Sequence, residues 1–344
     1  MSGRSLLQTK KPGMSRIPPA VVLFFLSPAI GELLSGSAPP VEFFNPIGFP
    51  LLSALYGSGA ILIRELTIRW KKGYSSLLLL GAAYGVTEEG LMVKSFFDPA
   101  WPDLGILGTF GRWIGINWVW AEMLTIYHAV FSIATPILLV ELAYPSKRKE
   151  CWVSSRALKG FIGLLVAIVL LGYFVLTPYF PPFPQYSLAV LATILLVYLA
   201  HKLPSDYGKL GSAPLHRPIL FWATGFLGTV TFFLTFWALP HLLNMPVAIM
   251  FFGALLAFVI ASFLKRFNWK GPSDLHQFAL ISGGLTFFII LAPLQELDKT
   301  RTDNPQGMSL VALAFLAGLL LLRRQIKQHT QTNEQIVEEG ASER

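Results

Sequence analysis

Two adjacent glutamates, Glu88 and Glu89, lie within residues 75–96, a stretch that is otherwise apolar enough to cross a bilayer. A carboxylate near the middle of a bilayer costs at least about 2.5 kcal/mol on insertion scales, so a pair there is expected to serve a function. Both carboxyls cannot ionise cheaply in a low dielectric, and one is expected to keep its proton. A charged and a neutral carboxyl beside an imidazole can act as base and acid toward water, and His128 is the candidate imidazole.

Helical geometry indicates how these groups meet. At about 100° per residue, Asn117 and His128 fall on one polar stripe of their helix, while Glu88 and Glu89 share a face with small residues on the preceding helix. Packing these faces together brings the carboxylates to His128, and Glu32 of the first helix can share the same outward-leaning cavity. We therefore predict Glu88, Glu89 and His128 as catalytic residues, and Asn117 and Glu32 as substrate-binding residues. The alternative is that both faces are polar contacts that only hold the helices together.

The composition is that of a membrane protein. Hydrophobic residues make up 53% of the 344 residues, charged residues make up 13%, and the mean hydropathy is +0.57. Such a chain has too little polar surface for a soluble globule. At a criterion of about 20 mostly apolar residues per span, about ten stretches qualify, which predicts an all-α, multi-pass bundle in the cell membrane. They cover residues 17–35, 47–69, 75–96, 116–143, 158–179, 186–202, 218–240, 245–264, 276–296 and 308–323.

Basic residues predict the orientation of the bundle. Most of the 27 Lys and Arg residues fall in alternate loops and in the two terminal segments, so the positive-inside rule places both termini in the cytoplasm. The net charge of +8 then reflects topology and attraction to anionic membrane lipids. No basic stretch is interleaved with aromatic residues, and nucleic acid is not an expected partner. A peptide, a lipid or an ion remains open as the substrate.

Ionisable residues divide the chain into unequal parts. We expect a basic cytoplasmic arm over residues 1–16, a four-helix region with the polar site over 17–145, a six-helix apolar region over 146–323, and a polar cytoplasmic tail over 324–344. The helix interiors after residue 158 carry almost no ionisable group. Function is therefore expected in the first four helices.

The outer loop 97–117 allows two interpretations. Its tryptophans and those that follow it are typical of anchors at the level of the lipid headgroups. The loop can instead be a re-entrant lid over the glutamates and the histidine, in which case Arg112 contacts the substrate. The tryptophans concerned are Trp101, Trp113, Trp118 and Trp120.

Motifs of cofactor enzymes are missing from the sequence. It has no HExxH pair for zinc, no GxSxG elbow, and no Walker or dinucleotide fingerprint in a suitable context. We therefore predict no metal ligand, and the sequence requires no cofactor.

The segments 85–97 and 126–131 resemble motifs of the CAAX-protease and bacteriocin-processing (CPBP) family of intramembrane proteases. That family has a Glu-Glu-x-x-x-Arg motif on one helix and a Phe-x-x-x-His motif on the next. Glu88 and Glu89 match the acidic pair and His128 matches the histidine, whereas Val93 and Leu124 stand at the arginine and phenylalanine positions. The resemblance implies a glutamate/histidine site that activates water for peptide cleavage in the membrane.

Three classes of function stay open from the sequence. The first is an intramembrane hydrolase or protease that uses the glutamate pair and His128. The second is a proton- or cation-coupled transporter or lipid carrier with the same residues as its proton site. The third is a non-catalytic membrane scaffold.

Overall fold

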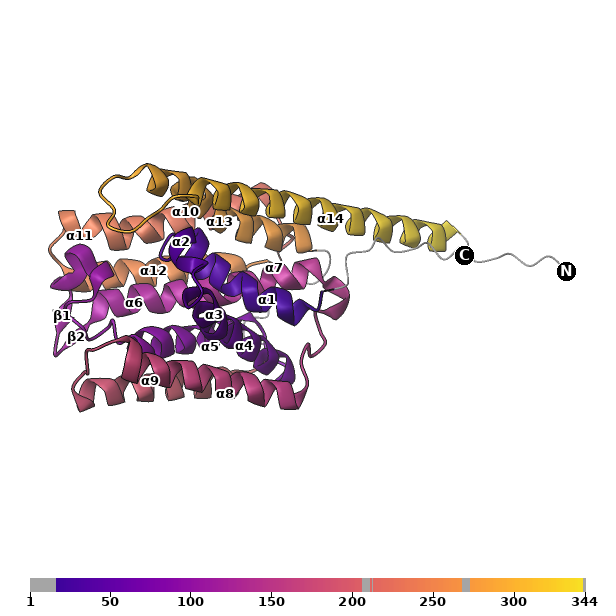
Figure 1. The fold of residues 1–344 in the computed structure, drawn as a ribbon. Helices are drawn as coiled ribbons and strands as arrows, with labels where there is room; N and C mark the ends of the chain where they lie inside the picture. The colour runs from indigo at the N-terminus through magenta and orange to yellow at the C-terminus, as the bar shows by residue number, and fades with distance from the viewer. Residues whose placement is uncertain (1–16, 206–210, 212, 268–272, 343–344) are drawn as a thin grey trace.

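The computed structural model of the chain describes residues 17–205, 211, 213–267 and 273–342. Within these residues the helices lie side by side along a common direction, and a short two-stranded hairpin stands at one end of the bundle (Figure 1). This confirms the predicted all-helical fold for the described part of the chain. The basic arm predicted for residues 1–16 lies outside the described residues.

Four helical rods form the first half of the chain, and each contains a π-helical segment. The rods are α1 (Pro19–Pro28) with η1 (Ala29–Leu34); α3 (Gly48–Leu52), η2 (Ser53–Gly57) and α4 (Ser58–Arg69); α5 (Tyr74–Val86) with η3 (Thr87–Met92); and α6 (Trp118–Tyr127), η5 (His128–Ala134) and α7 (Thr135–Ala143). Shorter elements join them: α2 (Pro40–Phe43), the 3₁₀ helix η4 (Pro102–Gly108), and strands β1 (Arg112–Trp113) and β2 (Ile116–Asn117).

Six further rods form the second half. They are α8 (Ser155–Leu171) with η7 (Gly172–Leu176); α9 (Phe183–Lys202); α10 (Pro218–Phe233) with η8 (Leu234–Ala238) and α11 (Leu239–Leu242); α12 (Pro246–Lys265); α13 (Asp274–Leu297); and α14 (Met308–Ser342). The 3₁₀ helix η6 (Pro145–Lys147) precedes α8.

Eight helices of the described residues are long and apolar enough to cross a membrane. All ten predicted stretches fold as helices, but two of them fall outside the eight. Residues 17–35 give the shorter apolar helix Pro19–Leu34, and residues 75–96 give α5 and η3. A membrane protein with several apolar helices is thus confirmed, while the count of ten spans and the N-in, C-in orientation stay predictions.

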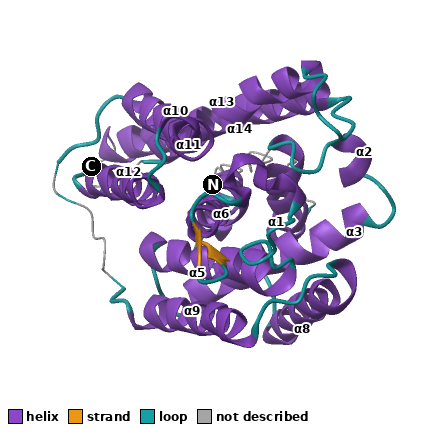
Figure 2. Cartoon of the chain, turned by 90° about the vertical axis from the view of Figure 1, so that its left-hand side faces the viewer, coloured by secondary structure: helices purple, strands orange, loops and turns teal. Residues whose placement is uncertain are grey.

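Burial separates central rods from peripheral ones. The segments Gly48–Arg69 and Trp118–Ala143 are each 72% buried inside the protein, whereas α9 and α12 are each only 11% buried. Viewed along the bundle, α5 and α6 lie near the middle and α8, α9, α12 and α13 lie around them (Figure 2). An apolar helix that buries little surface in the protein is suited to face lipid. The polar site therefore lies on the rods that are most shielded.

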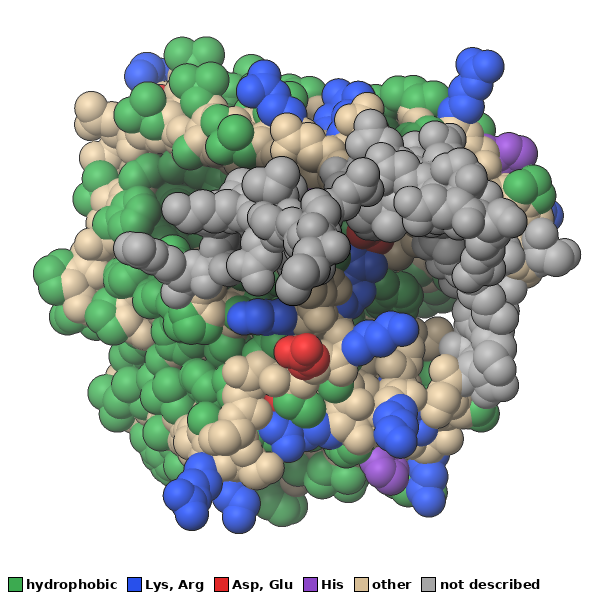
Figure 3. Space-filling view, turned by 90° about the vertical axis from the view of Figure 1, so that its right-hand side faces the viewer, with side chains coloured by type: hydrophobic (Ala, Val, Ile, Leu, Met, Phe, Trp, Pro, Cys, Tyr) green, Lys and Arg blue, Asp and Glu red, His purple; other side chains and the backbone are tan. Residues whose placement is uncertain are grey.

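Loops meet at two opposite ends of the bundle. At one end, Lys72 Nζ donates to the carbonyl of Leu203 at 2.6 Å, and Arg148 pairs with Asp274 at 2.9 Å. Lys and Arg side chains are spread over this end (Figure 3). At the hairpin end, Gln295 Nε2 donates to the carbonyl of Ser35 at 2.9 Å. Every second loop along the chain thus lies at the same end of the bundle, as expected when successive helices run in opposite directions.

Arg64 holds the basic end together. Its buried guanidinium lies 3.0 Å from Glu65 and 3.4 Å from Glu141, and it donates to the carbonyl of Arg148 at 2.8 Å. The same group stacks 3.7 Å above the Trp152 ring. A buried arginine is stable only when its charge and its N–H groups have partners of this kind. Glu65 and Glu141 thus have a structural partner and belong to the end of the bundle.

The two ends should lie on opposite sides of the membrane, with the basic end in the cytoplasm. Reporter domains fused after Lys149 and after Pro182 test this, because these residues lie in loops at opposite ends of α8 and η7. We expect a cytoplasmic signal at Lys149 and an external signal at Pro182. The reverse pair of signals would show that the positive-inside interpretation is wrong for this chain.

Candidate functional site

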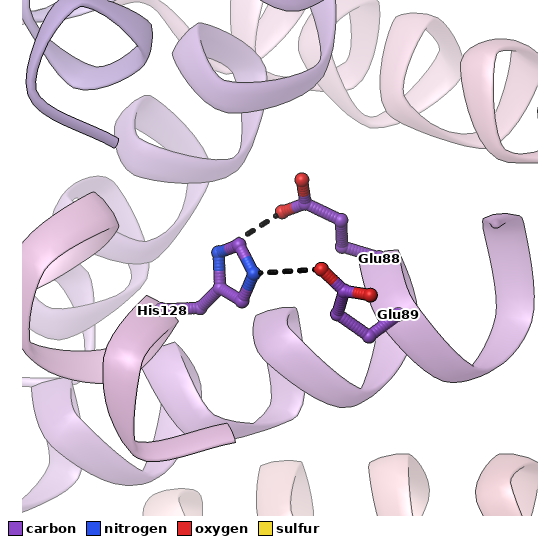
Figure 4. A group of neighbouring side chains, drawn as sticks. All are labelled: Glu88, Glu89 and His128. Carbon is purple, nitrogen blue, oxygen red and sulfur yellow. Dashed lines mark hydrogen bonds and ion pairs between the residues drawn. The ribbon is translucent and has the colours of Figure 1, made fainter. Parts of the chain in front are cut away.

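His128 stands between the two glutamates. Its Nε2 lies 3.1 Å from Glu89 Oε1, and its Nδ1 lies 3.3 Å from Glu88 Oε2. The glutamates come from η3 and the histidine from η5, and the imidazole ring points between the two carboxyl groups (Figure 4). Only 2% of His128 and 5% of Glu88 are exposed. The predicted proximity of Glu88 and Glu89 to His128 is confirmed, and their catalytic role stays a prediction.

Glu89 is held from two sides. One of its oxygens faces His128, and the other accepts a hydrogen bond from the Ser95 hydroxyl. Ser95 Oγ in turn accepts from the indole N–H of Trp120 at 3.0 Å. The roles of donor and acceptor in this contact depend on the tautomer of the imidazole. With Glu89 as a carboxylate, which can only accept, Nε2 is the donor. This pattern resembles a carboxylate that orients a histidine.

Glu88 is less tightly held than Glu89. Its Oε2 faces Nδ1, but no described residue donates a well-formed hydrogen bond to that atom. The buried Tyr84 hydroxyl likewise makes no well-formed hydrogen bond with a described residue, and the Glu88 carboxyl is the group with which it interacts. Buried polar atoms that lack a well-formed hydrogen bond are rare in proteins. Here the Glu88 carboxyl and the Tyr84 hydroxyl lie close enough to interact, but the contact between them is loose.

Glu32 joins this cluster through Tyr56. The Tyr56 hydroxyl donates to the Glu32 carboxylate, and the Tyr56 ring lies 5.9 Å from the His128 ring. Glu32 also interacts electrostatically with Glu88. The structure thus brings Glu32, which the sequence predicts to bind substrate, to the site. Its carboxylate already accepts a hydrogen bond from Tyr56.

Each rod changes to π-helical winding where it supplies a site residue. Glu32 lies in η1, Tyr56 in η2, the two glutamates in η3 and His128 in η5. A π turn inserts an extra residue into a helix, re-aims the following side chains and is frequent at functional sites. Four such turns therefore meet around one cluster.

Close packing of α5 against η5 makes the contacts short. A Cβ atom built on Gly81 would lie 2.9 Å from the Cα of Ala129, and one on Gly85 would lie 3.1 Å from the Cβ of His128. Larger residues at these positions would force the two helices apart. The small residues that share the glutamate face are thus required for the site.

Asn117 and Arg112 hold the outer loop and not the glutamates. Asn117 caps α6, since its side chain accepts from the backbone N–H of Trp120 at 3.0 Å and donates to the carbonyl of Leu107. Arg112 donates to the carbonyls of Phe97 at 2.8 Å and Gly108 at 3.1 Å. Both side chains are committed to the backbone, which argues against the predicted substrate contacts.

The outer loop nevertheless reaches the site. Ser95, two residues before the loop, bonds Glu89, and the pKa of Asp103 in η4 is raised by partial burial and then by the charge of Glu89. Trp120 is only 7% exposed, which does not fit a headgroup anchor, the first of the two interpretations that the sequence allows. The loop is an ordered cover on the hairpin side of the triad.

Several partners escape the sequence-based prediction. Tyr84 lies four residues before Glu88 and shares its face, and Ser132, on the polar stripe, lies 3.0 Å from His128 Nδ1. Their helical spacing could identify them. Tyr56 and Ser95 carry no comparable signal, because their contacts with Glu32 and Glu89 arise only from tertiary packing.

The triad could also hold a metal ion. Glu88, Glu89 and His128 each offer a ligand atom, and these atoms lie within 4.8 Å of one another. Carboxylates and imidazole suit Zn²⁺ and Mn²⁺. However, one ion binds one nitrogen of an imidazole, and the two carboxylates lie at opposite nitrogens of the ring. The observed arrangement therefore fits acid–base contacts directly and fits a metal only after a shift of side chains.

Comparison with known proteins identifies a family for most of the chain. Residues 21–266 match a family described as an uncharacterized membrane protein family. The chain belongs to this family. The matched region contains the whole triad together with Glu32, Tyr56 and Tyr84. No curated protein and no solved structure matches the chain.

The family match corrects the resemblance to CPBP proteases. The uncharacterized membrane protein family accounts for residues 21–266, and the CPBP family does not match. The resemblance covers about 50 residues and lacks the arginine and phenylalanine of both motifs. A pair of glutamates and a histidine on adjacent helices is too small a pattern to identify a family, because their chemistry is useful in many membrane proteins.

The close approach of α5 and η5 should be necessary for a stable site. We expect Gly81→Val to lower the free energy of unfolding by about 1–3 kcal/mol, because its Cβ meets the backbone of Ala129, which cannot rotate away. Thermal unfolding in detergent measures the effect. Gly163→Val in α8 is the matched control, since a Cβ there meets nothing within 4 Å. Equal melting temperatures for the two variants would contradict this account.

Proposed function

We propose that the protein is an intramembrane hydrolase that cleaves an amide or ester bond with a water activated by Glu88. The observation that carries the proposal is the inequality of the two glutamates around His128. Glu89 accepts from Ser95 and faces Nε2, whereas Glu88 Oε2 has the 3.3 Å contact with Nδ1 but no well-formed hydrogen bond with a described residue. A firmly held carboxylate is suited to orient the imidazole, and a loosely held one is suited to accept a proton from water.

Each group has a distinct role in the proposed reaction. Glu88 takes a proton from water, and the water oxygen bonds to the carbonyl carbon of the substrate. The carbonyl oxygen becomes an oxyanion and accepts a hydrogen bond from the Tyr84 hydroxyl. The bond to the leaving nitrogen or oxygen then breaks while His128, which starts as an imidazolium, gives that atom its Nδ1 proton and keeps the Nε2 proton toward Glu89. The proton on Glu88 returns to His128 across the 3.3 Å contact, and the products are a carboxylic acid and an amine or alcohol.

Proton-coupled transport is the second candidate function. The observation in its favour is the row of protonatable groups formed by Glu32 with Tyr56 and by Glu88 with His128 and Glu89. Such rows carry protons in pumps and transporters. A membrane scaffold has less support, because a scaffold gains nothing from two buried carboxyls whose partners are incomplete.

Removal of the charged groups tests the hydrolase. We expect Glu88→Gln, Glu89→Gln and His128→Ala each to lower turnover by at least about 100-fold, because each removes a proton-transferring or orienting group. The assay uses protein in nanodiscs with fluorogenic amide and ester probes that carry an acyl chain, in ¹⁸O-labelled water. Hydrolysis places one ¹⁸O atom in the acid product.

Controls separate hydrolysis from transport and from metal chemistry. Glu42→Gln, an exposed carboxylate in α2, should leave turnover unchanged. Loss of turnover with a chelator would assign the triad to a metal ion and exclude Glu88 as the direct base. Wild-type rates equal to those of the triad variants on every probe, with variant-dependent proton flux in liposomes, would favour the transporter.

Tyr84 should act on the transition state only. We expect Tyr84→Phe to lower kcat by about 100-fold with little change in KM, because the lost hydroxyl stabilises charge that develops during the reaction. The variant keeps the ring, which packs 6.1 Å from the His128 ring. Steady-state kinetics on the same probes measure the effect. A rise in KM at constant kcat would assign Tyr84 to substrate binding instead.

A further inference from the structure

A second site lies on another face of α6, where a cavity of about 280 Å³ opens between α6, α9 and α12. None of the three triad residues lines it. In the view along the bundle, α12 and α9 flank α6 from different sides (Figure 2). Both flanking helices bury little surface inside the protein, so the cavity lies at the lipid-facing surface of the bundle.

Two buried acceptor atoms distinguish this cavity from an ordinary apolar gap. Glu122 Oε2 and Gln185 Oε1 both belong to lining residues, and neither has a hydrogen-bond partner among the described residues. Gln185 Nε2 donates to the carbonyl of Ile114 at 3.0 Å, which leaves its oxygen as the free atom. Two acceptors without a donor are costly in an apolar place, unless a ligand supplies the donors.

The two acceptors lie toward one end of the cavity. Gln185 lies at the start of α9 near the hairpin, and Glu122 lies one turn into α6. The residues farther from the hairpin end, Ile126 and Ala192, are apolar, so both acceptors without partners lie toward the hairpin end of a mostly apolar cavity. A ligand that fits this arrangement has donors at the level of the lipid headgroups and an apolar chain that runs into the bilayer. The carboxyl of Glu122 adds a preference for a cation.

We propose that this cavity binds an aminophospholipid, with its ammonium group donating to Glu122 and Gln185 and one acyl chain along α9 and α12. Phosphatidylethanolamine has the three N–H donors that this site lacks. Phosphatidylcholine has the same charge and chains, but its quaternary ammonium cannot donate a hydrogen bond. The proposal is independent of the hydrolase, because it rests on a cavity that the triad does not line.

The test is a direct comparison of these two lipids. Detergent-solubilised full-length protein is titrated with phosphatidylethanolamine and with phosphatidylcholine of identical acyl chains, and bound lipid is counted by native mass spectrometry. We expect phosphatidylethanolamine to bind roughly tenfold more tightly, as a charge-assisted hydrogen bond provides. Glu122→Gln should remove most of this preference while leaving the apolar part of the cavity intact.

A filling variant tests the acyl-chain part. Ala192→Phe places a ring in the cavity and should abolish the binding of both lipids, whereas Ala257→Phe on the exposed face of α12 is the matched control and should change neither. Equal binding of the two lipids by the wild type would overturn the proposal and leave an unspecific apolar groove. Unchanged preference in Glu122→Gln would also overturn it, and that variant adds no volume that could prevent folding.

Discussion

The arrangement of the central helices depends on one interaction, the contact of a buried imidazole with two carboxyl groups. An isolated ionised carboxylate costs several kcal/mol to bury, and the cost falls only when an opposite charge or hydrogen-bond donors lie within contact distance. His128 meets this requirement for both Glu88 and Glu89, at 3.3 and 3.1 Å. The helices that supply these residues must therefore pack closely enough to keep these contacts. The small glycines of α5 allow this close packing, and the π turns of η3 and η5 direct the side chains toward each other.

The residues that flank the outer loop add a second constraint, because they hold Glu89 and make no contact with Glu88. Ser95 and Trp120 reach Glu89 only when residues 95–120 fold back over the bundle, and Asn117 holds that fold by capping α6. No comparable contact from this loop reaches Glu88. An order of this kind gives two chemically identical side chains different roles, in the way that different surroundings separate acid from base in other carboxylate pairs.

Sequence patterns predicted the class of the fold and the core of the site for physical reasons. Apolar runs of bilayer length determine where helices form, and helical phase alone places His128 opposite the glutamates. The contacts of Tyr56 and Ser95 could not be predicted, since they join Glu32 and Glu89 across tertiary structure and depend on π turns that shift helical phase. The polarity of Asn117 and Arg112 wrongly suggested that they bind substrate. Asn117 instead caps the start of α6, and Arg112 donates to three carbonyls of the loop.

The triad and the cavity between α6, α9 and α12 meet at the contact between α5 and α6. Gly85 lies against His128, and its neighbour Val86 lines the cavity together with Thr125, whose backbone also touches Gly85. An acyl chain in the cavity would therefore press on the same helix pair that sets the distance between His128 and the glutamates. A bound lipid can influence the triad only if it changes the distance between His128 and the glutamates. A ligand shifts a conformational equilibrium only when it binds one of the two conformations more tightly than the other. Because the glycine contacts of α5 keep the α5–α6 spacing fixed, lipid binding and the proposed turnover should be independent of each other.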